Sequence, residues 1–147
     1  MGFFNTMDIS ASGLTAQRLR MDVLSQNIAN ADTTRTENGG PYRRKIILFQ
    51  EKENSYPFNS FFNDAMSRAV SGNGVRVSRI VEDESPGPQI YEPSHPDADE
   101  NGYVTKPNVN IVEEMVNMIS ASRSYEANIT AINNTKAMIA KTLEISR

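Results

Sequence analysis

Apolar residues recur every seven positions near both ends of the chain. At the beginning, the repeat consists of Met7, Leu14, Met21 and Ile28, with Leu24 at the intermediate position. Near the end, it consists of Ile111, Met118, Tyr125, Ile132 and Ile139, with Met115, Ile129 and Leu143 at the second position. A helix that packs along its length repeats every seven residues, so the spacing predicts two long α-helices. All of these residues except Leu143 form the predicted assembly interface.

A second apolar row accompanies each repeat. It contains Ile9, Ala16, Leu19 and Val23 in the first segment, and Val112, Val116, Ile119, Ala131, Met138 and Ile145 in the last. A surface helix of a monomeric domain shows one apolar stripe, so two stripes predict helices that are covered from two directions. The chain is also rich in Asn and Ser, which favour caps and turns over helix interiors. We therefore expect both helices to be poorly ordered until partners cover them.

The middle of the chain has a different pattern. Runs that are rich in β-branched and aromatic residues predict strands at 42–50, 75–81 and 89–91. Gly72-Asn73-Gly74 is expected to form a hairpin turn. In a stretch of low charge between the first two strands, three aromatic residues are expected to contact a neighbouring molecule: Phe58, Phe61 and Phe62.

These patterns predict a mainly α fold with a small β-rich insert. The N- and C-terminal helices are expected to pair as an elongated coiled-coil-like unit. Residues 1–36 would form the first helix of that unit, residues 37–106 the insert, and residues 107–147 the second helix.

Composition and charge exclude several functional classes. The chain has no cysteine, which rules out disulfides, thiolate metal sites and thiol nucleophiles. It carries 15 basic and 18 acidic residues and no basic cluster larger than Arg43-Arg44-Lys45, so we expect no nucleic-acid partner. No apolar run reaches the ~18 residues that a membrane span needs, so we expect no membrane insertion. The first residues lack the features of a cleaved secretory signal.

One motif is similar to a calcium-binding loop. Asp97-x-Asp99-x-Asn101-Gly102 matches the opening of an EF-hand, but the twelfth position holds Asn108 instead of a bidentate Glu. Prolines before the motif also disfavour an incoming helix. We interpret the motif as a turn that connects the insert to the last helix, and we keep a calcium-responsive binding module, or a soluble coiled-coil adaptor, as the alternative function.

Other candidate residues point away from catalysis. His95 is the only histidine and is expected to make a structural hydrogen bond in a loop. Glu113 and Glu114 are adjacent, so their side chains diverge on a helix, and we expect them to stabilise its amino end. We therefore predict no enzyme activity, no metal and no cofactor. Arginine makes bidentate contacts, so candidates for functional polar contacts are Arg18, Arg20, Arg43, Arg44 and Arg123.

The two ends of the chain resemble a known family. Residues 12–17, SGLTAQ, and 27–34, NIANADTT, resemble the amino-terminal signature of bacterial flagellar axial proteins, the rod and hook family. Residues 110–138, which include MVNM and RSYEAN, resemble the other end of that family. Between them, residues 91–110 resemble the C-type proximal rod members in particular.

The resemblance implies a structural function. A proximal rod subunit would polymerise through its terminal helices into the drive shaft of the flagellar basal body, which transmits torque and encloses the export channel. Its partners would be other copies of itself, other flagellar rod proteins and the flagellar type III export apparatus. It would be located in the rod, which crosses the periplasm, after export without a cleaved signal peptide.

Overall fold

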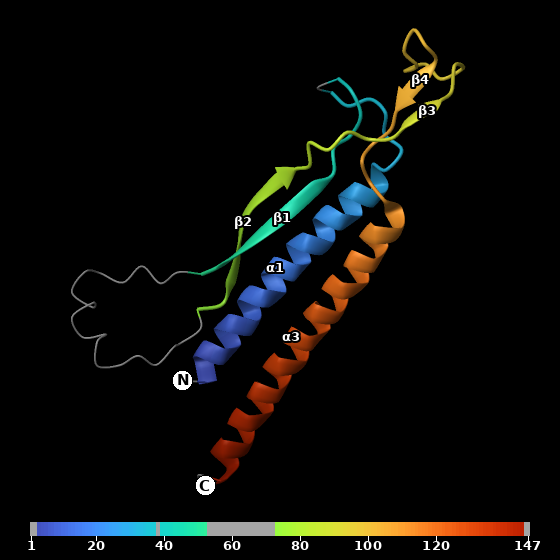
Figure 1. The fold of residues 1–147 in the computed structure, drawn as a ribbon. Coiled ribbons are helices and arrows are strands. Elements are labelled where there is room, and N and C mark those ends of the chain that lie inside the picture. Colours follow the sequence, from blue (N-terminus) through green and yellow to red (C-terminus); the bar gives the residue numbers. More distant parts are fainter. Residues whose placement is uncertain (1–2, 38, 53–72, 146–147) are drawn as a thin grey trace, which may run out of the picture.

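A computed structural model describes residues 3–37, 39–52 and 73–145. Two long helices at the chain ends lie side by side, and two small hairpins come between them in the sequence (Figure 1). The elements in chain order are α1 (Phe3–Ala29), β1 (Lys45–Glu51), β2 (Val75–Glu82), β3 (Gln89–Tyr91), β4 (Tyr103–Thr105) and α3 (Ile111–Ile145). The predicted class, a mainly α protein with a small β-rich insert, is confirmed.

Helix α3 begins at a capping residue, Asn110. The side-chain oxygen of Asn110 accepts hydrogen bonds from the backbone N–H groups of Val112 (3.1 Å) and Glu113 (3.4 Å). This is the geometry of an N-cap residue, which satisfies donors that have no partner inside the helix. Pro107 precedes the cap, where it cannot interrupt the helix. The helix then runs for 35 residues, against 27 for α1.

Two contacts define how α1 and α3 pair. At one end, Asn27 donates a hydrogen bond to Glu114 over 2.8 Å. Farther along, a Cβ atom added to Gly13 would lie 3.0 Å from the side-chain oxygen of Asn128. The two pairs are two heptads apart on both helices, with α1 running opposite to α3. In this antiparallel register the last turns of α3 extend past the start of α1 (Figure 1).

The residues that are buried along α3 show which side of this helix faces α1. The fully buried residues of α3 are Glu114, Ala121 and Thr135, which share one heptad position. Side chains that the sequence places at the second position of the repeat remain exposed instead: Met115 (54%), Ile129 (38%) and Leu143 (67%). The buried row thus lies one residue before the row of large apolar residues. The role of Met115 and Ile129 in assembly stays a prediction.

The second apolar row of α1 is covered by the chain itself. Ala16 (3% exposed) and Val23 (4%) are buried, and α1 contacts both β1 and β2 as well as α3. Helix α1 therefore lies between α3 and the β1–β2 hairpin (Figure 1). The prediction of two covered sides is confirmed for α1.

The insert differs from the prediction in two details. Strands β1 and β2 pair antiparallel with a bulge between Leu48 and Phe49, and their connection runs from residue 52 to 74. The predicted hairpin turn at Gly72-Asn73-Gly74 is therefore wrong, since Gly74 (φ +82°) leads into β2 at the end of a long connection. Strand β4 pairs with β3 and was not predicted. Gly72 and the aromatic residues Phe58, Phe61 and Phe62 lie outside the described residues.

Candidate functional site

A buried polar cluster joins the two helices to the insert. Its centre is Glu114, which is 1% exposed, next to Asn27, which is 0% exposed. One carboxylate oxygen of Glu114 accepts a hydrogen bond from Asn27, and the other accepts one from the Nε of Arg44 over 2.8 Å. A second guanidinium nitrogen of Arg44 lies 2.7 Å from the same oxygen. We call Asn27, Tyr42, Arg44 and Glu114 the polar junction.

Asn27 uses its whole side-chain amide in this junction. Its nitrogen donates to Glu114 and to the backbone oxygen of Lys45 (2.9 Å). Its oxygen accepts from the Tyr42 hydroxyl (2.9 Å) and from the backbone N–H of Lys45 (2.9 Å). A buried amide with both donors and both acceptor positions occupied carries no desolvation penalty for an unpaired group. Asn27 therefore binds the first residue of β1 to the end of α1.

Arg44 extends the junction towards the start of α3. Its backbone N–H donates to the side-chain oxygen of Asn108 (2.9 Å), and its guanidinium also contacts Glu113 (3.2 Å). Burial disfavours the charge on Arg44, but the hydrogen bond with Glu114 and the negative charges of Glu114, Glu113 and Asp83 raise its pKa above the ordinary value. The junction thus contains a charged pair that has further hydrogen-bond partners in Asn27 and Glu113, and such partners help to offset the burial of its charges.

The pKa of Tyr42 is also raised. Burial of the hydroxyl is the largest cause, and the negative charges of Glu82 and Glu114 act in the same direction. The neutral hydroxyl is the form that can donate to Asn27.

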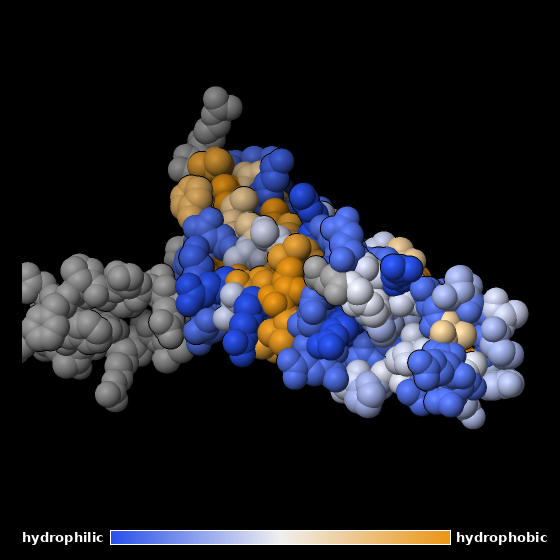
Figure 2. Space-filling view, turned by 90° about the horizontal axis from the view of Figure 1, so that it is seen from above, coloured by the Kyte–Doolittle hydropathy of each residue, from blue (hydrophilic) through white to orange (hydrophobic). Residues whose placement is uncertain are grey.

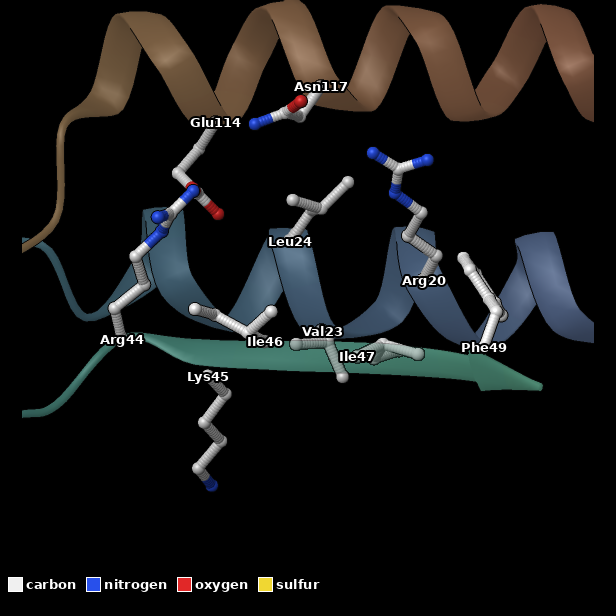
Figure 3. Close-up of a pocket in the computed structure, with 10 residues that line it drawn as sticks. All are labelled: Arg20, Val23, Leu24, Arg44, Lys45, Ile46, Ile47, Phe49, Glu114 and Asn117. Atoms are coloured by element: carbon white, nitrogen blue, oxygen red, sulfur yellow. The ribbon is translucent and has the colours of Figure 1, made fainter. Parts of the chain in front are cut away.

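A small pocket lies beside the polar junction, between α1, β1 and α3 (Figure 3). Its volume is about 210 Å³. Apolar side chains form one part of its wall: Val23, Leu24, Ile46, Ile47 and Phe49. Arg20 and Asn117 extend into the space between the two helices, whereas the side chain of Lys45 points away (Figure 3). Among its lining residues the pocket brings together no nucleophile with an adjacent base.

The sequence pattern predicts that Glu113 and Glu114 stabilise the amino end of a helix, and both lie in the first turn of α3. The burial of Glu114 and its contacts with Asn27 and Arg44 were not predicted. Asn110 provides the cap, Glu113 stays exposed (57%), and Glu114 is buried because it occupies the heptad position that faces α1. Asn27 was not recognised as a site residue at all. No local pattern marks Asn27 or Glu114 as buried; of the residues in the polar junction, Arg44 alone was already a candidate for polar contacts.

The predicted loop residues make structural contacts. The Asp97–Gly102 segment connects β3 to β4, not the insert to α3. One oxygen of Asp99 accepts the backbone N–H groups of Asn101 and Tyr103, both at 2.9 Å, and Asp97 accepts the hydroxyl of Thr34 at 2.8 Å. This is the geometry of an Asx turn.

His95 makes the hydrogen bond that was expected of it, since its Nδ1 accepts the N–H of Asp97 (3.1 Å). Within residues 3–37, 39–52 and 73–145, no group of three or more His, Asp or Glu side chains is arranged to hold a metal ion. In the same ranges, no helix has the length and apolar character of a membrane span.

The predicted assembly residues fall into two groups. Leu24 is buried, and the half-buried members are Met7, Leu14, Met21, Ile28, Met118, Tyr125, Ile132 and Ile139. The exposed members are Ile111 (42%), Met115 and Ile129, which lie on α3.

The exposed members belong to a larger apolar face of α3. Near the start of α3, this outer face contains Ile111, Val112 (70%), Met115, Val116 (61%) and Ile119 (55%). At the end of the helix, further apolar side chains are exposed: Met138 (53%), Leu143 and Ile145 (80%). Next to Val116, a shallow groove is lined by Ile119, Ser120, Arg123, Ser124 and Ala127. Seen from above, hydrophobic side chains reach the molecular surface in patches among hydrophilic ones (Figure 2). Contiguous exposed apolar surface of this kind marks an interaction site.

Fold and site together define a class of protein: an elongated pair of terminal helices, fastened to a β-rich insert by a buried polar junction, with one apolar helix face left for packing. Comparison with known proteins identifies the family. Residues 100–145 match the C-terminal domain model described as "Flagellar basal body rod FlgEFG protein C-terminal", and residues 7–35 match "Flagella basal body rod protein".

Curated relatives match over the full length of the chain. The flagellar basal-body rod protein FlgC of Bacillus subtilis is 52% identical, with all of both chains covered. FlgC of Borreliella burgdorferi is 51% identical over 99% of this chain and 98% of its own, and FlgC of Salmonella typhimurium is 43% identical over all of both. The chain therefore belongs to the family of flagellar basal-body rod proteins, as the resemblance of its terminal and central motifs implied.

Proposed function

We propose that this protein is a structural subunit of the proximal rod in the bacterial flagellar basal body. Full-length relatives that carry the name of a basal-body rod protein support this function. The observation that carries it in the structure is the outer face of α3, where apolar side chains stay exposed although the chain has folded around α1. A subunit that is completed only by its neighbours needs such a face.

The predicted assembly residues take two roles in this proposal. The buried and half-buried members hold α1 and α3 together, so that the outer face is presented as a rigid surface. The exposed members, Ile111, Met115 and Ile129, contact neighbouring subunits directly, together with Val116 and Ile119. The partners are other copies of this chain and other rod proteins.

The finer parts of the function follow from the family. The subunit would transmit torque as part of the drive shaft and surround the export channel, at a position that crosses the periplasm. It would reach this position through the flagellar type III export apparatus, without cleavage of a signal peptide. In this role it needs no cofactor, catalyses no reaction, binds no nucleic acid and does not insert into a membrane.

The alternative function, a calcium-responsive module or a soluble coiled-coil adaptor, has no support in the contacts or the relatives. Calcium would have to replace the hydrogen bonds that occupy Asp97 and Asp99.

Charge substitution on the outer face tests the proposal. Val116→Asp combined with Ile119→Asp should abolish motility and incorporation into isolated basal bodies, because a desolvated carboxylate without a partner opposes packing. Both residues are more than half exposed, so the melting temperature of the purified chain should stay unchanged.

Ser25→Asp, which adds a charge at an exposed position of α1, is the control and should leave motility intact. Normal incorporation of the double variant, at normal expression and export, would contradict the proposal.

A further inference from the structure

The buried row of α3 in its contact with α1 contains little that could fix one register by shape. The buried positions of α3 are occupied by Ala121, Thr135 and Glu114. Gly13 of α1 faces Asn128 of α3. Coiled coils select their register through large apolar residues that fit into holes, or through a buried polar residue that needs one particular partner. Small and uncharged residues can be exchanged for one another when a helix slides by one heptad.

One such slide has a competing ion pair available. If α3 moved by seven residues relative to α1, Ala121 would face Gly13, and Glu114 would face Arg20 instead of Asn27. The shift amounts to about 10 Å along the helix. Arg20 lies in the space between the helices, on the side towards which Glu114 would move (Figure 3). Glu114 could therefore find a cation in either register.

We propose that Glu114 is a positioning residue that selects the observed register, through its simultaneous contacts with Asn27 and Arg44. Only this register gives the carboxylate an amide donor from α1 and a guanidinium from the chain segment before β1, at 2.7–2.8 Å. Specificity is a difference between two affinities, and the additional bonds of the junction provide that difference.

The register has a consequence for assembly. It decides how far α3 extends past the start of α1, and so which apolar side chains at its end, Met138, Leu143 and Ile145, stay uncovered. This consequence rests on the proposed function, but the selection of the register does not. It can be measured on the purified full-length chain, so failure of one idea leaves the other standing.

Disulfide trapping can report the register, because the chain contains no cysteine of its own. In the observed register, residues 17 and 124 are opposite each other, so Gln17→Cys combined with Ser124→Cys reports this register. Gln17→Cys with Asn117→Cys lies one heptad away, and it should remain unbridged because a disulfide needs Cα atoms within about 7 Å. With native residues in the junction, we expect the first pair to close and the second to stay reduced.

Removing the guanidinium should change this result. With Arg44→Met, Glu114 keeps Arg20 as its remaining cation, and the fraction of the second disulfide should rise at least about tenfold. Arg43→Met removes a charge from the exposed neighbouring residue and should leave the ratio of the two disulfides unchanged. If Arg44 only added stability, its substitution would lower the melting temperature without changing the ratio of the two disulfides.

A second variant covers the case in which Arg44→Met does not fold. Arg44→Met combined with Glu114→Leu removes both charges, and replacing a buried ion pair by apolar residues commonly preserves folding. This chain should form both disulfides in comparable amounts. If either variant forms the first disulfide as completely as the Arg43→Met control, with no second disulfide, packing alone sets the register and the proposal is wrong.

Discussion

Helices α1 and α3 share one sequence pattern and have different surroundings. Each carries a heptad repeat and a second apolar row. In α1 both rows are covered within the chain, by α3 on one side and by the β1–β2 hairpin on the other. In α3 one row faces α1 and the other remains exposed. A second apolar row therefore predicts a second cover, but the pattern does not say whether the cover is a neighbour or the chain's own insert.

The difference has an energetic meaning. Burying a Val or Ile side chain contributes about 1.5–3 kcal/mol. For Val23, at 4% exposure, this contribution is made when the chain folds, whereas for Val116, at 61%, it is available only on assembly. The two helices thus divide the apolar surface into a part that stabilises the subunit and a part that can stabilise a larger assembly.

Val23→Asp gives the largest effect that we expect from this comparison. It places a carboxylate without a partner between α1 and the hairpin, and such a buried charge costs about 3–5 kcal/mol. Urea unfolding followed by circular dichroism should show this loss. Val112→Asp makes the same chemical change at a residue that is 70% exposed on α3, and it should alter the free energy of unfolding by less than about 0.5 kcal/mol. Equal effects of the two substitutions would remove the distinction between the helices.

Hydrogen exchange on the purified chain should show the same distinction without a substitution. Amides at 14–27 of α1 are covered on two sides, whereas those at 139–145 lie in the part of α3 that extends past the start of α1. We expect protection factors at least about 100-fold larger in the first range, since local opening is easiest where few apolar contacts hold a segment. The same measurement tests the sequence-based expectation that both helices are poorly ordered in the isolated chain, which predicts weak protection in both ranges. Equal protection of the two ranges would show that α3 is stable without α1.

The long helices could be predicted from the sequence, because an uninterrupted period of seven over several turns leaves few other structures possible. The segment 107–147, predicted to hold the second helix, contains α3, Ile111–Ile145. Strand β4, Tyr103–Thr105, was missed although β3 is equally short, because it directly follows the turn residues 97–102. Its partner β3 lies across the Asx turn at Asp99. Residues 103–105 form a strand because they pair with β3.

The polar junction could not be predicted, for a different reason. Asn27 and Glu114 are buried only because each satisfies the other and both meet the chain next to β1. Such a network has no local signal, since its members are far apart in the sequence and each alone favours the surface. The buried row of α3 was missed similarly, because side-chain size favoured Met115 over Glu114.

A smaller effect is expected from the side of α1 that faces α3. In the part of the chain that the structure describes, the side-chain oxygen of Gln17 is the one buried side-chain polar atom without a hydrogen-bond partner. Gln17→Met keeps the length of the side chain and removes this oxygen, so it should stabilise the chain by about 1 kcal/mol. Thermal unfolding would show a higher melting temperature. Gln26→Met, at an exposed position of the same helix, is the control and should have little effect.

The smallest effect concerns the place where the end of α1 meets the insert. Tyr42 donates its hydroxyl proton to Asn27 over 2.9 Å, and its pKa is raised, chiefly by burial. A raised pKa means that folding favours the neutral hydroxyl. Its contribution is therefore fully present below the unfolded value of about pH 10 and is lost as the pH rises through the higher value of the folded chain.

Comparison with Tyr42→Phe isolates this contribution. At pH 8 the wild-type chain should be more stable than the variant by about 1 kcal/mol, the contribution of one hydrogen bond. Urea unfolding at pH 8–11 should show this difference shrinking above about pH 10. Tyr91→Phe, at an exposed tyrosine (63%), should change the stability at pH 8 by less than about 0.5 kcal/mol. Equal stability of the two chains at pH 8 would mean that the Tyr42 ring, which the variant keeps, and not its hydroxyl, holds the end of α1 to the insert.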